Sequence, residues 1–194
     1  MKQFSIYPPL ELKAPRPGQL LIAEPLLNDV NFTRSVILLC EHGEAGSVGF
    51  VLNHSTDIKL KNLISDIPTN GPLIYKGGPV QPDTLHLMHR VPSHLGEGKK
   101  IADGIYWGGS FEELYDLATN KNYNEDDVRL FLGYSGWAPG QLEDEIKEGT
   151  WLIANGTEDI IFGTDHENIW KAAIATLGRK YAHLAHIPTD PQLN

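Results

Sequence analysis

A histidine with carboxylates around it is the part of this sequence best suited to acid–base chemistry. Glu41 and His42 follow a run of apolar residues, 36–40, which is typical of a buried strand that ends at the rim of a sheet. An imidazole that a carboxylate orients can accept and release protons near neutral pH. The carboxylates that could orient His42 are those of Glu41, Glu143 and Glu145. The sequence therefore predicts either a proton-transfer site or a ligand contact at this rim.

A structural interpretation competes with the functional one. A charged residue after a buried strand is usually just solvated, and Arg34 and Glu41, at the two ends of the strand, could simply fasten turns. Under the functional interpretation the same residues border a groove beside Trp137. The sequence allows a binding protein, with a hydrolase that uses His42 and a nearby carboxylate as the alternative.

The signature segment, residues 133–146, reads GYSGWAPGQLEDEI and combines glycines, two large aromatic side chains, a proline and several carboxylates. Glycines permit tight backbone and aromatic rings supply contact area, a composition typical of functional loops. We predict that it joins a strand end to a helix start, with Trp137 either in the core or along a groove. Acidic residues in a first helical turn are stabilised by the helix dipole, which accounts for the acids without any ligand but leaves Gln141 unexplained. The predicted ligand-binding residues are Arg34, Glu41, His42, Trp137, Gln141, Glu143 and Glu145.

Two glycine-containing motifs lack residues that enzymatic loops require. Ser135 lies in GYSGW, which approaches the nucleophile elbow G-x-S-x-G, but Trp137 occupies a position that needs a small residue. We therefore expect Ser135 to be a polar residue in a tight turn. Gly77-Gly78-Pro79 is followed by neither G-K-[ST] nor G-x-x-G, so we expect a backbone turn there in place of a phosphate-binding loop.

Three closely spaced histidines, His86, His89 and His94, suggest a metal site at first sight. On a strand, however, His86 and His89 point to opposite faces because side chains alternate, so they would not converge on one ion. Zinc needs three or four converging ligands, and Cys40 alone adds little. The sequence predicts no metal and no other cofactor.

The charge and composition favour a globular protein that does not contact nucleic acid directly. The chain has 194 residues, of which 41% are hydrophobic and 21% charged, and a formal net charge of −9. No run of basic residues exceeds a pair, so phosphate backbones should be repelled. Cys40 is the single cysteine, and no segment approaches the roughly 18–20 apolar residues of a membrane span. Because the first residues also lack a secretory-signal pattern, we expect a cytoplasmic protein without membrane contact.

The pattern of apolar residues predicts one α+β domain with an extension at each end. Residues 1–17 hold four of the thirteen prolines and should form an extended arm, residues 18–181 the domain, and residues 182–194 a weakly patterned tail. Many early strands and mixed order later argue against a regular βαβ array. Strands are predicted at residues 19–24, 34–41, 47–53, 73–75, 84–91, 105–107, 128–134, 151–154 and 160–162. Helices are predicted near residues 60–64 and over 110–118, 141–147 and 164–177.

Four ordered motifs resemble those of the AlgH-like (YqgE) family of bacteria. They are RSVILLCEH at residues 34–42, GSVGFVLN at 46–53, Gly77-Gly78-Pro79 with His89 beyond it, and the signature segment. The resemblance implies a bent, branching β-sheet that forms a partial barrel flanked by helices. The family name also implies a role in gene regulation. Because the sequence has no helix-turn-helix and no basic face, we expect this role to be indirect, through binding of a small molecule or another protein.

Overall fold

In the part of the chain that the structure describes, ten strands form one open, mainly antiparallel sheet. The computed structural model describes residues 14–64, 71–96, 98–120 and 123–188, so most of the predicted arm, residues 1–13, lies outside the described residues. The strands are β1 (Gln19–Ala23), β2 (Val36–Gly43), β3 (Gly46–Val51), β4 (Ser55–Lys59), β5 (Leu73–Lys76), β6 (Val80–His89), β7 (Lys99–Ala102), β8 (Ile105–Trp107), β9 (Val128–Trp137) and β10 (Trp151–Asn155). Their order is β10-β1-β2-β3-β9-β6-β8-β7, and β4 joins through β5, which pairs with β9.

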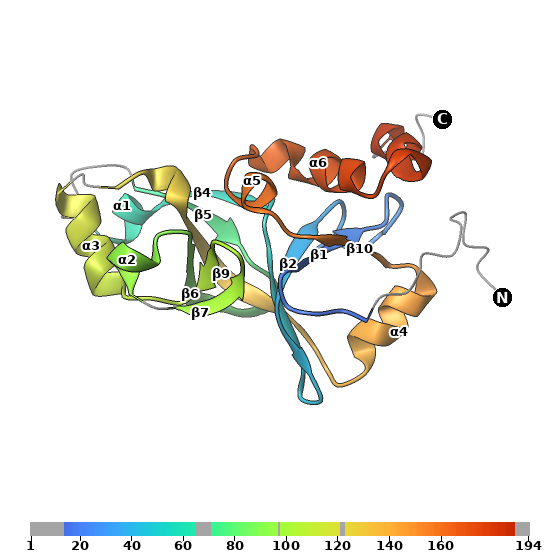
Figure 1. The fold of residues 1–194 in the computed structure, drawn as a ribbon, viewed down its shortest axis with the longest axis horizontal. Helices are drawn as coiled ribbons and strands as arrows, with labels where there is room; N and C mark the ends of the chain where they lie inside the picture. The colour runs from blue at the N-terminus through green and yellow to red at the C-terminus, as the bar shows by residue number, and fades with distance from the viewer. Residues whose placement is uncertain (1–13, 65–70, 97, 121–122, 189–194) are drawn as a thin grey trace.

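Strand β9 connects the two halves of the sheet because its neighbours change along its length. Residues 128–134 pair with β6 and, in parallel, with β5, whereas residues 135–137 pair with β3. Gly133 lies just before this change of partners and has a φ of +64°, a left-handed conformation that suits glycine. The α+β class and the bent, branching sheet are therefore confirmed, and the sheet remains open instead of closing into a barrel (Figure 1).

Helices cover the sheet on separate faces. In Figure 1 the helices α5 and α6 lie above the strands β1, β2 and β10, and α4 lies below them. The helices α2 and α3 flank the other half of the sheet. The helices are α1 (Leu60–Leu63), α2 (Pro92–Leu95), α3 (Phe111–Asn120), α4 (Gln141–Glu148), α5 (Glu158–Ile161) and α6 (Ile169–Thr176), with the 3₁₀ helices η1 (Glu125–Asp127), η2 (His166–Asn168) and η3 (Arg179–His186).

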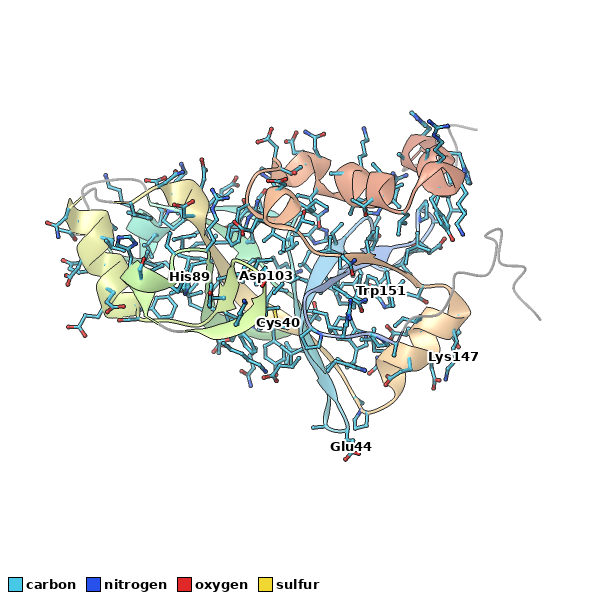
Figure 2. The ribbon with its side chains drawn as sticks, viewed as in Figure 1. Cys40, Glu44, His89, Asp103, Lys147 and Trp151 are labelled. Carbon is cyan, nitrogen blue, oxygen red and sulfur yellow. The ribbon has the colours of Figure 1, made fainter. Side chains whose placement is uncertain are left out.

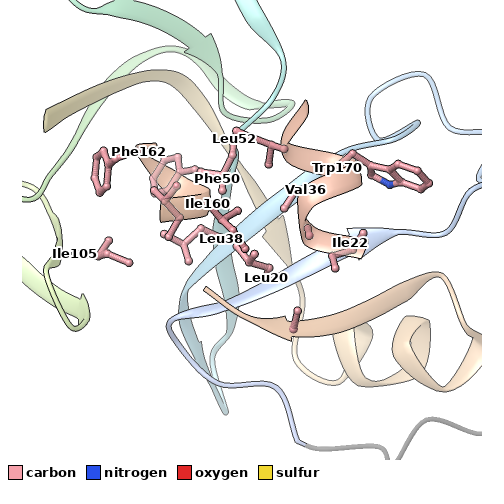
Figure 3. Packing of buried hydrophobic residues seen from close by; sticks show 14 of the residues in the cluster. Leu20, Ile22, Val36, Leu38, Phe50, Leu52, Ile105, Ile160, Phe162 and Trp170 are labelled. Atoms are coloured by element: carbon pink, nitrogen blue, oxygen red, sulfur yellow. The ribbon is translucent and has the colours of Figure 1, made fainter. Parts of the chain in front are cut away.

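Each helical layer covers its own apolar cluster. The largest cluster, which includes Leu38 and Trp170 (Figure 3), packs the sheet against α5 and α6. Tyr181 and Leu184 of η3 belong to the same cluster. A second cluster packs Leu39 and its neighbours against α4, and a third lies beneath α2 and α3. Because Leu38 and Leu39 face different clusters, β2 is buried on both sides, as its continuous apolar run predicts.

The prediction of a strand at residues 160–162 is wrong, because these residues lie in α5 and just after it. The Thr157 side chain accepts a hydrogen bond from the backbone N–H of Ile160 and so caps the helix. Glu158 and Asp159 in the first turn favour the positive end of the helix. This local chemistry outweighs the short apolar run.

The pattern of apolar residues does not predict two further strands, β4 and β7, because their sequences are polar. They read STDIK and KKIA, and among the described strands each pairs with a single neighbour. Strands at a sheet margin are held by backbone pairing and tolerate charged side chains. The connection between β2 and β3 is also shorter than predicted, since only Glu44 and Ala45 lie between the two strands. Figure 2 shows Glu44 at the tip of this hairpin, which projects from the body of the molecule.

The packed core extends past residue 181, the predicted end of the domain. Leu184 in η3 is fully buried in the largest cluster. Farther along, the backbone carbonyl of Ile187 accepts a hydrogen bond from the Arg34 guanidinium. None of the helices in the described part of the chain has the length and apolar character needed to cross a membrane.

Candidate functional site

The carboxylate of Glu145 binds two tryptophans that lie under α4. Its Oε2 accepts hydrogen bonds from the indole Nε1 of Trp137 at 2.8 Å and of Trp151 at 2.7 Å. The two rings meet edge to face with centroids 6.1 Å apart, and they are only 7% and 2% exposed. Glu145 therefore holds α4 on the sheet and satisfies two buried N–H groups. Trp137 therefore lies in the core and not along a groove.

Gln141 completes this network from the first turn of α4. Its Oε1 accepts a hydrogen bond from the backbone N–H of Ala138 at 3.0 Å, and its Nε2 donates one to Glu145 Oε1 at 2.9 Å. The side chain thus fixes the turn that leads into the helix. This is the explanation for Gln141 that the sequence does not provide.

His42 faces the same helix from the β2–β3 hairpin. Its Nδ1 lies 2.9 Å from Ser47 Oγ, and its Nε2 lies 3.7 Å from Glu143 Oε1. The longer distance exceeds that of a hydrogen bond and allows an ion pair only when the imidazole is protonated. The side chains of His42 and Glu143 remain 17% and 38% exposed, so solvent reaches both of them.

The side chain of Glu41 points away from that of His42. The pairing of β2 with β3 shifts register between Leu39 and Glu41, and neighbouring side chains on a strand point to opposite faces. Glu41 forms an ion pair of 2.6 Å with Lys99 of β7, and both side chains are about half exposed. Such exposed pairs contribute only about 0–1 kcal/mol.

Arg34 lies at the other end of β2 and contacts the C-terminal region. Its guanidinium carbon is 4.3 Å from the ring centroid of Trp170, and it donates a hydrogen bond to Ile187. The Asn53 amide donates to the Arg34 carbonyl and accepts the backbone N–H of Val36, which fixes the start of the strand. Arg34 and Glu41 are therefore separate from the α4 group. The predicted residues that the structure brings together are His42, Trp137, Gln141, Glu143 and Glu145.

Ser135 and the Gly77-Gly78-Pro79 motif meet where β9 crosses the connection from β5 to β6. The fully buried Ser135 hydroxyl donates to the Gly77 carbonyl at 3.1 Å, and the backbone N–H of Val51 donates to the same oxygen at 2.9 Å. Ser135 lies in a strand, so the prediction of a tight turn is wrong. The contact ties the two halves of the sheet together.

Of the cavities formed by described residues, two lie elsewhere on the molecule, and none of the seven predicted residues lines either of them. The larger is an open cleft of about 720 Å³ beside Asp103, Glu158 and Asp159. The smaller, of about 210 Å³, is lined by Arg129 and Lys59. Arg129 is not among the seven predicted residues, although an arginine inside the apolar run of β9 is a recognisable signal.

His86 and His89, both on β6, contact aromatic rings of different strands, as their spacing predicts. The His86 ring lies 5.0 Å from the ring of Phe50 between centroids, whereas the His89 ring stacks on Tyr106 at 5.6 Å. Phe50 belongs to the largest apolar cluster, and His89 Nε2 lies on the other side, toward Gly109. The two imidazoles therefore do not converge.

Burial lowers the pKa of His54, His86 and His89, which predicts sensitivity to acid. Below a pH of about 6.5 the unfolded chain binds protons that the folded chain resists, so folding becomes less favourable as the pH falls. The free energy of unfolding should drop between pH 7 and pH 5, by at most about 1.4 kcal/mol per histidine and pH unit. Urea unfolding at several pH values would measure this slope. His54→Gln and His89→Gln should each flatten it, and a wild-type profile that is already flat would contradict the prediction.

The branched open sheet, with α4 fastened by Glu145, defines a single-domain α+β protein. The profile of the AlgH-like family matches residues 20–182, so the chain belongs to the AlgH-like family. A UPF0301 protein of Chlorobium limicola is 40% identical over 179 residues, which cover 92% of this chain and 96% of that protein. Another from Parabacteroides distasonis is 41% identical over 182 residues, which cover 93% and 92%.

Solved structures show the same fold. The crystal structure of a Corynebacterium diphtheriae protein matches with a TM-score of 0.77 and 23% identity, over 91% of this chain and 94% of that one. The solution structure of the AlgH protein from Pseudomonas aeruginosa matches with a TM-score of 0.68 and 28% identity, over 92% and 98%. The function of the family is uncharacterised, so a function for this chain has to be argued from its own geometry.

Proposed function

We propose that this AlgH-like protein acts by binding a partner protein through the β2–β3 hairpin and α4. Small-molecule sites are concave, and neither of the two cavities is lined by the predicted site residues. His42 and Glu143 instead lie on a hairpin that projects from the body and on the helix beside it (Figure 1). This position on a projecting surface is the observation that carries the proposal.

The charge of this surface favours a basic partner. Glu44 at the hairpin tip and Glu148 on α4 are exposed, and Glu143 is half-exposed. The one lysine on α4, Lys147, is paired with Asp144 at 2.8 Å. An acidic surface repels nucleic acid, so a role in gene regulation would act through a protein partner. We propose that the protein and its partner meet in the cytoplasm. The only cysteine, Cys40, is buried and unpaired, so the fold does not depend on the oxidising conditions that disulfides require.

A hydrolase is the second candidate because the Ser47 hydroxyl lies next to one ring nitrogen of His42 and the Glu143 carboxylate lies near the other. A serine next to an imidazole whose other nitrogen faces a carboxylate is the arrangement of serine hydrolases. Ser47 is only 5% exposed, however, and lines neither cavity, which leaves little access for a substrate. The hydrolase therefore ranks below the binding protein.

Site-specific photo-crosslinking in cells tests the binding proposal. A photoreactive residue at Glu44 should give a discrete adduct with another protein, whereas the same residue at the exposed Glu112 of α3 should not. Glu143→Lys should reduce the adduct about tenfold, which corresponds to about 1.4 kcal/mol of binding. Asp116→Lys on α3 is the matched control and should leave the adduct unchanged.

Two results would count against this assignment. Equal adducts from positions 44 and 112 would show that the hairpin has no specific partner. Labelling of the wild type by a fluorophosphonate, with loss of the label in Ser47→Ala, would favour the hydrolase instead.

A further inference from the structure

Arg129 is a cation held inside the fold. Its side chain is 6% exposed. Its Nη1 donates to the carbonyl of Leu52 at 3.1 Å, and its Nη2 donates to the carbonyl of Thr164 at 3.3 Å. Its guanidinium carbon lies 4.7 Å from the ring centroid of Tyr75. These contacts orient the guanidinium without supplying a full negative charge.

Within the described residues, Arg129 forms no ion pair with a carboxylate. Buried charges are normally paired because removing an ion from water is costly. Burial lowers the pKa of Arg129, although Tyr75 and Asp126 act in the opposite direction. A planar guanidinium in this situation is well suited to receive a carboxylate or a phosphate group.

Arg129 lines the 210 Å³ cavity together with a second cation, Lys59. Lys59 ends β4 and also forms no ion pair in the part of the chain that the structure describes. Tyr75 and Phe162 add aromatic walls to the same cavity. The cavity thus offers two positive groups and apolar surface in one place.

Two carboxylates, those of Glu125 and Asp126, line the cavity as well. One oxygen of Glu125 accepts a hydrogen bond from the backbone N–H of Gly71 at 3.1 Å. These acids disfavour a highly charged ligand such as a polyphosphate or a nucleic acid. The volume of about 210 Å³ is below the roughly 300–1,000 Å³ of common ligand pockets, which limits the ligand to a small molecule.

We propose that this cavity binds a small organic anion, a carboxylate or a phosphate monoester, whose charged group pairs with Arg129. A guanidinium binds both groups through two parallel hydrogen bonds. Lys59 forms the second contact, and the aromatic walls contact the rest of the ligand. The site shares no residue with the β2–β3 hairpin or α4, so it does not depend on the proposed partner surface.

Titration of the whole chain with inorganic phosphate, acetate and succinate tests the site, with sodium chloride at equal ionic strength as the reference. At least one of the three probes should raise the melting temperature in a saturable way and shift the Nε–Hε resonance of Arg129. Lys59→Met should weaken this response at least fivefold. Lys61→Met removes an exposed lysine that does not line the cavity and should leave the response unchanged.

The inference fails if no probe acts beyond the chloride reference. It fails equally if the two lysine variants weaken the response to the same extent, because general surface charge would then account for it. Arg129→Met should abolish the response. If that variant does not fold, the comparison of Lys59→Met with Lys61→Met and the shift of the Arg129 resonance still test the site. Lys59→Met should leave crosslinking from position 44 intact, which separates failure of this site from failure of the partner surface.

Discussion

Trp137→Ala should lower the free energy of unfolding by about 3–5 kcal/mol. The ring is 7% exposed and packs with Leu39 and Leu142 between the sheet and α4. Truncation would leave a cavity there and remove one of the two indole donors that bind Glu145. Because small domains are stable by only about 5–15 kcal/mol, urea unfolding followed by circular dichroism should resolve this loss easily.

Two variants separate ring volume from hydrogen bonding. Trp137→Phe keeps most of the ring and should cost less than the alanine variant. Glu145→Ala removes the oxygen that accepts both indole N–H groups and leaves these two buried donors without a partner. It should cost about 1–3 kcal/mol, the range for a buried donor left unpaired. If Trp137→Ala stayed within about 1 kcal/mol of the wild type, the side chain would not be part of the core.

The sequence identifies the signature segment but cannot show what its side chains bind. Trp137 and Glu145 carry the groups that ligand sites use, and the second indole comes from Trp151, a residue of a different strand. Whether Glu145 meets a ligand or Trp151 depends on how α4 packs against β10, which no local pattern encodes. Among the carboxylates considered for His42, Glu143 lies nearest to it in space. The side chains of Glu41 and His42 point to opposite faces because the two residues are neighbours on one strand.

Strands with long apolar runs can be predicted from the sequence. Strands that are held mainly by backbone hydrogen bonds to their neighbours are harder to predict. β2 and β9 are recognisable from their apolar residues, whereas the polar edge strands β4 and β7 depend on their neighbours. The extension of β9 through Trp137 depends on pairing with β3, so the local sequence, rich in glycine, resembles a loop. The position of Arg129 inside an apolar run indicates burial, but its contacts with Tyr75 and with the carbonyl of Thr164 depend on distant segments of the chain.

Gly78→Ala should prevent native packing and lower the free energy of unfolding by at least about 4 kcal/mol. A Cβ on Gly78 would lie 2.3 Å from the carbonyl carbon and oxygen of Tyr134 and 2.4 Å from the backbone nitrogen of Ser135. These are backbone atoms of β9, so no side-chain rotation can relieve the clash. Moving the connection away would break the hydrogen bonds that Ser135 and Val51 donate to Gly77.

The matched control is Gly43→Ala near the hairpin tip, where an added Cβ would meet nothing within 4 Å. That variant should change the free energy of unfolding by about 0.5 kcal/mol or less, as is usual for surface substitutions. Urea unfolding and the yield of folded protein would compare the two. A Gly78→Ala protein with wild-type stability would mean that β9 does not pass this close to the Gly-Gly-Pro connection. The large predicted difference follows from one cause: Gly78 gives β9 room to cross between the two halves of the sheet.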